Sequence, residues 1–257
     1  LVLAVFLSYR FIYQPLYALH LYNLGYEQLE ERDYPSSENY FQRGLDQMVM
    51  KKQFFRYAEG FQEQKQWTLA EEKYEQLLTN FPLDKQGTLD YARMELETLS
   101  NYEKSAELLN NYLREEPQDY EALLLLGDTY LEWGQEDPSK YQEARMSYAL
   151  LMEQYGVRDL LLFRMLRYFI RTDNQPEVMK LKNYFQANPN ADIDAEAYTE
   201  LGGYLIDRER LADVQEILFR AKDANERLPE THYQLSRYFN RMTEYNEEEK
   251  ALRNTLS

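Results

Sequence analysis

Residues 101–134 read NYEKSAELLNNYLREEPQDYEALLLLGDTYLEWG and contain two helical patterns separated by a proline. The proline, Pro117, cannot continue a helix, because its ring has no N–H group and clashes with the preceding turn. Apolar residues recur at helical spacing on both sides of it, namely Leu108, Leu109, Tyr112 and Leu113, then Leu123, Leu126, Tyr130 and Trp133. This stretch therefore predicts a helix, a tight turn and a second helix.

Small residues fall where two helices joined by so short a turn have to approach closely, at Ser105, Ala106, Ala122 and Gly127. This combination of small, apolar and proline positions resembles one unit of a tetratricopeptide repeat, which has a period of about 34 residues. Tyr112 departs from the pattern, since a small residue is usual at its position. If the resemblance is real, the same pattern should recur along the rest of the chain at intervals of about 34 residues.

The pattern recurs along almost the whole chain. We expect an all-α fold, a right-handed superhelix (an α-solenoid) of about seven helix-turn-helix repeats, because stacked neighbours cover each unit's apolar face. The predicted units are 18–50, 51–85, 86–119, 120–158, 159–194, 195–228 and 229–257. Helix turns are expected near Pro82, Pro117, Pro189 and Pro229, and the seventh unit includes Tyr245 and Leu252.

Two units depart from the regular frame. The third carries one extra residue, which the frame places before its first helix, and Arg93 then occupies a small-residue position, so looser packing is expected. In the fourth, Tyr141 and the apolar residues after it arrive late, so 135–140 is predicted to be an inserted loop.

An apolar segment, 1–17, precedes the array, with an apolar run from Leu1 to Tyr9. Nine helical residues span about 14 Å, against roughly 30 Å of bilayer hydrocarbon, so this run alone cannot cross a membrane. It is interpreted as the end of a transmembrane anchor, with Tyr9, Tyr13 and Tyr17 as interfacial aromatics. The alternative is an apolar helix that caps the first repeat. We expect the native chain to continue at both ends.

The sequence holds no pattern for a reaction. Cysteine is absent and only two histidines occur, and there is no HExxH, Walker or GxSxG motif. His232 falls at a packing position, which favours a core histidine over a ligand. The prediction is therefore a non-enzymatic protein with no catalytic, cofactor-binding or metal-binding residues. A net charge of -16 also argues against nucleic acid as the main partner.

Other proteins are the expected partners, and arginines are the first candidates for binding them. Arg167 and Arg171 share one face of a predicted first helix, as do Arg237 and Arg241, and Arg164 lies one turn before the first pair. These positions line the groove of a tetratricopeptide array. The arginines either hold carboxylates of a partner or pair with neighbouring Glu and Asp side chains within the chain.

Apolar groove positions give a second candidate surface, for which we choose Tyr22, Tyr26, Phe55, Leu124 and Phe163. Chaperone-binding relatives hold carboxylates with Lys and Asn at two groove positions, where this chain has Tyr22 and Tyr26. That activity is not expected here.

A further resemblance covers nearly the whole chain. It is carried by LGYEQLEERDY, KKQFFRYAEGF, LAEEKYEQLLTNFP, LGDTYLEWGQEDPSKY, LLFRMLRYFIRTDN, LGGYLIDRERLADVQEILFRA and HYQLSRYFNR. The chain resembles the membrane-anchored repeat proteins of the spirochaete periplasmic flagellar collar. The resemblance implies a scaffold anchored in the inner membrane, with its repeats in the periplasm, that contacts collar and stator components. The alternative is a soluble, cytoplasmic adaptor or chaperone that binds extended peptides in its groove.

Overall fold

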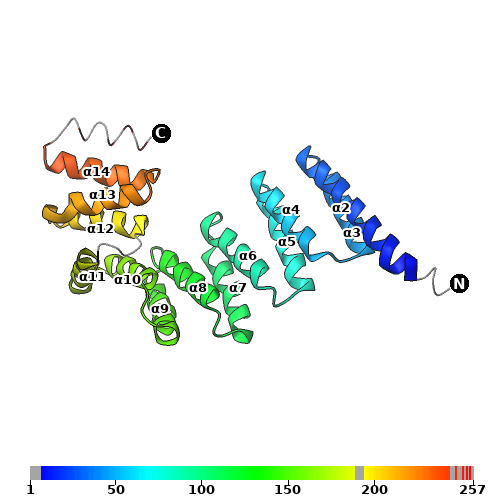
Figure 1. The fold of residues 1–257 in the computed structure, drawn as a ribbon, viewed down its shortest axis with the longest axis horizontal. Coiled ribbons are helices and arrows are strands. Elements are labelled where there is room, and N and C mark those ends of the chain that lie inside the picture. Colours follow the sequence, from blue (N-terminus) through cyan, green and yellow to red (C-terminus); the bar gives the residue numbers. More distant parts are fainter. Residues whose placement is uncertain are drawn as a thin grey trace. The chain divides into compact units, whose positions relative to one another are not determined.

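The structure is a computed structural model that describes residues 7–188 and 194–243, together with Glu247, Ala251, Arg253 and Thr255. These residues contain thirteen α-helices, one π-helical segment and two short 3-10 helices (Figure 1). In chain order they are η1 Tyr9–Tyr13, α2 Gln14–Glu30, α3 Tyr34–Gln47, α4 Lys51–Glu63, α5 Trp67–Asn80, α6 Lys85–Glu97, α7 Tyr102–Glu115, α8 Tyr120–Trp133, η2 Pro138–Lys140, α9 Tyr141–Tyr155, α10 Asp159–Arg171, α11 Gln175–Ala187, α12 Ala195–Asp207, η3 Leu211–Asp213, α13 Val214–Ala224 and α14 Pro229–Arg241.

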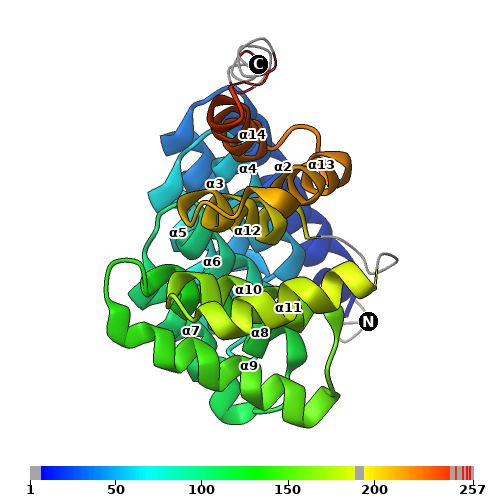
Figure 2. The same cartoon turned by 90° about the vertical axis from the view of Figure 1, so that its left-hand side faces the viewer.

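Consecutive helices pack as pairs within two compact units of the chain. In unit 1, Leu1–Pro117, α2 packs on α3, α4 on α5, and α6 on α7. In unit 2, Gln118–Ser257, the pairs are α8 with α9, α10 with α11, and α12 with α13, and α14 packs on both α12 and α13. We call α2, α4, α6, α8, α10, α12 and α14 the first helices of their repeats. In Figure 2, α10, α12 and α14 lie in successive layers of unit 2.

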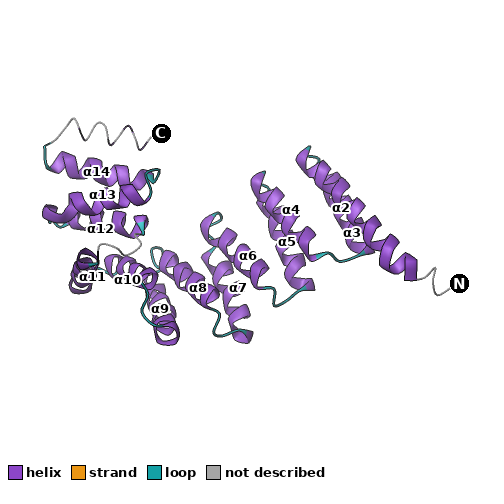
Figure 3. Cartoon of the chain, viewed as in Figure 1, coloured by secondary structure: helices purple, strands orange, loops and turns teal. Residues whose placement is uncertain are grey.

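The predicted all-α fold is confirmed in the described residues, which contain no strand (Figure 3). Helices end before the turns that hold Pro82 and Pro117, and Pro229 is the first residue of α14. The predicted loop 135–140 is also present, with η2 inside it, and α9 resumes at Tyr141. Of the predicted turns, the one at Pro189 lies outside the described residues.

Side chains of Asp and Asn begin several helices by binding the free N–H groups of the first turn. Asp119, for example, accepts a hydrogen bond from the Ala122 amide at 3.0 Å. The same capping bond is made by Asp33, Asp84, Asn101, Asn174 and Asp194. Because these caps follow the short turns directly, local sequence fixes where the helices start.

A residue with left-handed backbone follows the first helix of six repeats, namely Arg32, Lys65, Ser100, Asp173, Glu209 and Thr243. Residues other than glycine rarely adopt positive φ. After α4, the Lys65 amide donates to the Gln62 carbonyl at 2.9 Å and the Gln66 amide donates to the Phe61 carbonyl at 2.8 Å. This is the Schellman pattern, which satisfies the last carbonyls of a helix. Within the described residues the α8–α9 connection, which carries the longer loop, has no such residue.

Gly127 of α8 lies at the predicted close approach of two helices. A Cβ atom there would lie 2.5 Å from Cε1 of Tyr148 in α9. The aromatic ring of the second helix therefore packs directly on the backbone of the first. The prediction that this small residue permits a close helix crossing is confirmed.

The third repeat is corrected by one residue. In α6 it is Ala92 that is completely buried, whereas Arg93 is exposed and pairs with Asp90 at 3.3 Å. The extra residue lies instead in the turn 98–101, which is one residue longer than the turn 64–66 between α4 and α5. The frame of α6 therefore begins one residue earlier than predicted, and the prediction that Arg93 occupies the helix crossing is wrong.

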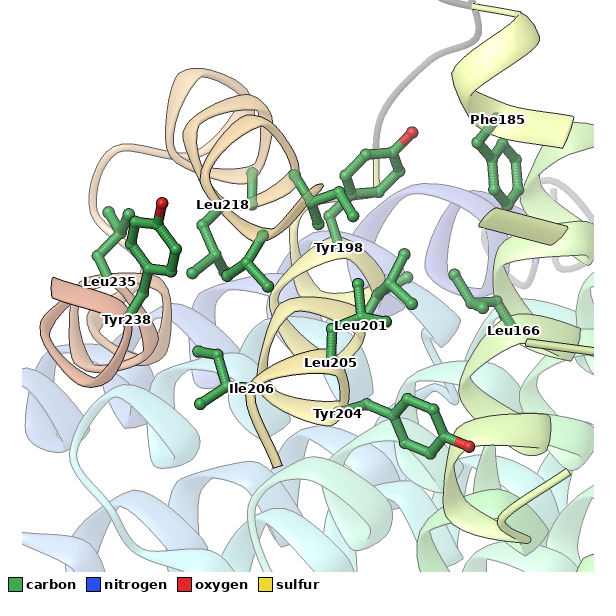
Figure 4. Packing of buried hydrophobic residues seen from close by; sticks show 14 of the residues in the cluster. Leu166, Phe185, Tyr198, Leu201, Tyr204, Leu205, Ile206, Leu218, Leu235 and Tyr238 are labelled. Atoms are coloured by element: carbon green, nitrogen blue, oxygen red, sulfur yellow. The ribbon is translucent and has the colours of Figure 1, made fainter. Parts of the chain in front are cut away.

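Each unit has its own apolar core. Figure 4 shows α12 at the centre of the unit 2 core, with side chains of α10 and α11 on one side and of α13 and α14 on the other. The unit 1 core is largely aromatic, and its buried rings include Phe41, which meets Tyr22, Phe54 and Tyr57 edge to face. Buried aromatic rings remove large apolar areas from water, so they dominate the packing between helices.

The first helix of unit 1 begins before the predicted array. The helical chain runs without a break from Leu7 through η1 into α2, across the predicted boundary at 17–18. No helix in the described residues has the length and apolarity needed to span a bilayer, so the predicted membrane helix is not supported there. Residues 1–6 lie outside the described part of the chain, as do Tyr245 and Leu252 of the seventh unit.

Candidate functional site

The predicted groove arginines of α10 lie inside unit 2 between α8 and α12. Arg164 reaches both neighbours, because its Nε atom is 2.8 Å from Asp128 Oδ1 on α8 and its Nη1 atom is 2.7 Å from Asp194 Oδ2, which precedes α12. Tyr148 of α9 donates to the same Asp128 carboxylate at 2.7 Å. Burial raises the pKa of Asp128, against the opposing effect of the Arg164 charge. Arg164 thus joins three layers of the unit.

Arg167 and Arg171 share two carboxylates. The Nη2 atoms of both arginines contact Glu200 Oε1 on α12, at 2.8 Å and 2.9 Å. Both also contact Glu132 Oε1 on α8, at 3.2 Å and 3.1 Å, and Arg167 pairs with Glu196 at 3.3 Å. Burial lowers the pKa of Arg167, but the charges of Glu200, Glu132 and Glu196 and the hydrogen bond to Glu200 together outweigh burial, so the pKa is raised. We call these three arginines and their five carboxylates the α10 network.

The α10 network shows the second of the two alternatives for these arginines, pairing within the chain. The side chain of Arg167 is 12% exposed and that of Arg171 is 13% exposed. Three guanidinium groups face five carboxylates, Asp128, Glu132, Asp194, Glu196 and Glu200, so the network is negatively charged as a whole. Its geometry stabilises the stacking of α8, α10 and α12.

The arginines of α14 differ from each other. Arg237 contacts Asp207 through Nη2 and donates to Gln234 Oε1 at 2.8 Å. Arg241 is exposed and forms no ion pair with a described residue. The five predicted groove arginines therefore do not form one open surface, because four of them are engaged in ion pairs inside the unit.

Two of the predicted apolar groove residues are core residues. Tyr22 is completely buried and donates to the Met48 carbonyl at 2.9 Å. Phe163 is 2% exposed and stacks on Phe185 of α11, with ring centroids 4.2 Å apart. The prediction that these two line an open groove is wrong, because the second helices cover them. Tyr26, Phe55 and Leu124 are half-buried, and Arg56 lies over the Tyr26 ring at 3.8 Å.

A hollow of about 380 Å³ lies in unit 1 along the first helices α4 and α6. It is lined by Glu59, Gln62, Tyr74, Gln86, Asp90, Arg93, Met94, Glu97 and Thr98. Three carboxylates face one guanidinium there, and Arg93 is paired with Asp90 at 3.3 Å. Glu59 has no hydrogen bond or ion pair with a described residue. We call this feature the acidic hollow.

Sequence reasoning missed the acidic hollow, in part because of the one-residue error in the frame of α6. The predicted frame put Arg93 at the helix crossing, and although it left Asp90 and Glu97 at groove positions, neither was chosen as a candidate. A frame that begins at Lys85, directly after the capping Asp84, brings Arg93 and Glu97 to the groove positions that Arg167 and Arg171 occupy in α10. The capping aspartate was the signal that could have found it.

Histidine and metal chemistry find no site in the described residues. No group of three or more His, Asp or Glu side chains there is placed to hold a metal ion. His232 is buried, and its Nε2 atom lies 2.8 Å from the Glu226 carbonyl. The prediction that His232 is a packing residue is confirmed.

Comparisons with known proteins place this geometry among repeat folds. No protein-family model and no curated protein sequence matches the chain. A tetratricopeptide repeat protein from Parabacteroides merdae is 14% identical, with 93% of this chain and 99% of that one covered at a TM-score of 0.68. Pseudomonas aeruginosa PilF is 13% identical, with 86% and 97% covered at 0.54. PilW, a type IV pilus biogenesis factor, is 14% identical, with 84% and 97% covered at 0.57. The chain thus has the fold of tetratricopeptide-repeat proteins.

Proposed function

We propose that this protein is a non-enzymatic scaffold that binds other proteins through the first helices of its repeats. The acidic hollow is the observation that carries the proposal. It is an open feature on two first helices, and it presents Glu59 without a hydrogen bond or ion pair to any residue in the described part of the chain. Its excess of carboxylates suits a partner segment with Lys or Arg side chains, which gain charge-assisted hydrogen bonds there. The α10 network contributes rigidity rather than binding.

Charge reversal in the acidic hollow tests this proposal. Glu59→Lys with Glu97→Lys is expected to abolish capture of proteins that co-purify with the tagged wild-type chain after crosslinking in cells. Glu115→Lys with Glu116→Lys is the matched control, because it makes the same charge change at exposed positions at the end of α7. Equal loss in both variants would mean that only net charge matters. Unchanged capture in both would remove the acidic hollow from the proposal.

We further propose that the scaffold belongs to an inner-membrane-anchored assembly in the periplasm, the spirochaete flagellar collar, where it supports assembly and stator placement. The motif resemblance along the chain supports this placement. A second support is the apolar surface at the start of unit 1, where Phe11 is 72% exposed, Ile12 59% and Leu16 62%. Side chains of this kind are stabilised by burial in a bilayer or against another protein.

Cell fractionation tests the membrane part of this proposal. Ile12→Ser with Leu16→Ser is expected to shift the protein from the membrane pellet to the soluble fraction. Met146→Ser with Val157→Ser is the control, because it removes two exposed apolar side chains from unit 2. A wild-type chain found entirely in the soluble fraction would favour the alternative, a soluble adaptor that binds extended peptides.

A further inference from the structure

Glu95 of α6 is a buried carboxyl group without a conventional partner. The residue is 0% exposed, and with every carboxyl group ionised neither of its side-chain oxygens has a hydrogen-bond partner among the described residues. An ionised carboxylate in such a place is shielded from water, and it is destabilised unless donors and cations replace the lost hydration. A proton on the Glu95 carboxyl group or on a neighbouring acidic group would remove this unfavourable charge.

The groups around Glu95 come from both helices packed against α6. The carboxyl group of Glu71 on α5 lies within hydrogen-bonding reach, and Glu75 of α5 adds a second acidic group nearby. From the side of α7, the positive charge of Lys104 acts on Glu95, and the side chain of the capping Asn101 also favours the ionised form. Lys104 is shared, because its Nζ atom is 3.6 Å from Glu75 Oε1. Acidic groups therefore outnumber the positive charge.

On α6 itself, Tyr91 is also engaged with this group of acids. Its hydroxyl donates to Glu75 Oε1 at 3.3 Å, and its ring stacks on Tyr74 of α5 with centroids 5.4 Å apart. The tyrosine proton is thus used by Glu75 and does not reach Glu95. Two carboxyl groups in contact can hydrogen-bond only if one of them is protonated, because an ionised carboxylate is an acceptor without a donor.

We propose that Glu71 and Glu95 share one proton and act as a pH-sensitive latch between α5 and α6. With the proton present, one carboxyl group donates to the other and joins the second helix of the second repeat to the first helix of the third. When the proton leaves to solvent, two negative charges face each other beside Glu75, and the charge of Lys104 and the Asn101 side chain oppose their repulsion in part. The contact between the two helices then becomes repulsive.

The pKa of Glu95 agrees with this geometry. Burial raises it first, followed by the hydrogen bond and charge of Glu71, while Asn101 and Lys104 act in the opposite direction, and the result is about 7. An unfolded Glu titrates near 4.3. Between these two values the folded chain binds more protons than the unfolded chain, so stability decreases as pH rises through this window. The latch is closed at the acid end and open at the alkaline end.

The latch has a direct connection to the acidic hollow. Helix α6 supplies Asp90, Arg93 and Glu97 to the hollow, and Tyr74, which stacks on Tyr91, lines the same hollow. Release of α6 from α5 therefore changes the wall of the hollow. A shift of about one pH unit near neutrality is enough to alter the latch, because the pKa lies there.

Glu95→Gln tests the latch, because the amide has the same shape, donates a hydrogen bond and does not titrate. The melting temperature of this variant relative to wild type is expected to rise steadily between pH 5 and pH 8. Glu97→Gln is the matched control on the same helix, because Glu97 is exposed, and its offset from wild type should not change with pH. An offset for Glu95→Gln that stays constant across this range would overturn the proposal.

A measurement on the unaltered chain keeps the test independent of whether a variant folds well. The carboxyl carbon of Glu95, followed by NMR in selectively labelled protein, should titrate with a midpoint near 7. In Glu71→Gln the midpoint should fall by at least one unit, because the like charge is replaced by an amide donor. A Glu95 midpoint near 4.5 in wild type, or one that Glu71→Gln leaves unchanged, would show that no proton is shared.

Discussion

At the residue scale, Gly127 shows how much a helix pair depends on one missing side chain. Gly127→Leu is expected to lower the free energy of unfolding by about 1 to 3 kcal/mol, because the Tyr148 ring occupies the space of the new side chain. Ala149→Leu is the control, since it adds a similar bulk at an exposed position of α9. Urea unfolding of both variants is the measurement. Equal midpoints would contradict the close crossing.

The sequence left two roles open for Arg167, namely binding a partner's carboxylates and pairing within the chain. The structure shows which substitutions distinguish these two roles. Arg167→Glu is expected to cost about 3 kcal/mol of stability, because it removes a mostly buried cation and adds a charge beside Glu132 and Glu200. Arg241→Glu should change the melting temperature very little, since Arg241 is exposed and unpaired with described residues. If Arg167→Glu melts like wild type but loses a bound protein, the partner-binding role is restored.

Residue types and spacing predicted the face on which the arginines lie, but not what they meet there. The partners Glu132 and Glu200 are far from Arg167 in sequence and are brought to it by helices on either side. The prediction that Tyr22 and Phe163 line an open groove was wrong for a related reason. Their repeat positions are accessible in a regular array, but the large rings of Phe41 and Phe185 in the second helices draw them into the core.

At the element scale, the turns after the first helices use left-handed residues that are not glycine. Lys65→Gly is expected to raise the free energy of unfolding by about 0.5 to 1 kcal/mol, because the left-handed conformation costs an L-residue roughly 1 to 2 kcal/mol. Lys65→Val should lower it, since a branched Cβ is strained at positive φ. Thermal melts of the two variants should therefore move in opposite directions. If both melting temperatures moved in the same direction, contacts of the Lys65 side chain rather than its backbone conformation would determine the change in stability.

The ends of helices were predictable where local chemistry sets them. Pro117 ends one helix pair, and Asp119 caps the next helix through a hydrogen bond within its own first turn. The end and the start of these helices can therefore be predicted from adjacent residues in the sequence. The third repeat was less predictable, because an extra residue can be placed before α6 or after it without changing the apolar spacing much. Packing decides between these positions, since only one of them buries Ala92.

At the scale of the whole molecule, the charge of -16 opposes folding through repulsion between carboxylates. Raising the salt concentration from about 20 mM to about 200 mM should therefore raise the melting temperature, because the Debye length falls to roughly 10 Å or less. The α10 network is mostly buried and is screened less. Calorimetry in sodium chloride measures the effect, with sucrose as the uncharged control. A melting temperature that falls with salt would show that ion pairs outweigh the general repulsion.

The sequence by itself determined the helical class, the period, the turns at Pro82 and Pro117 and the loop before Tyr141. These follow from backbone geometry and apolar spacing, which act over one or two turns of chain. The tertiary structure alone decided the state of each charged group. Arg167 is neutralised by carboxylates of α8 and α12, whereas Glu95 is buried opposite another acid, although both lie on first helices of their repeats. The free energy of a charge depends on its burial and on the sign of what faces it, and both are fixed only when distant helices pack.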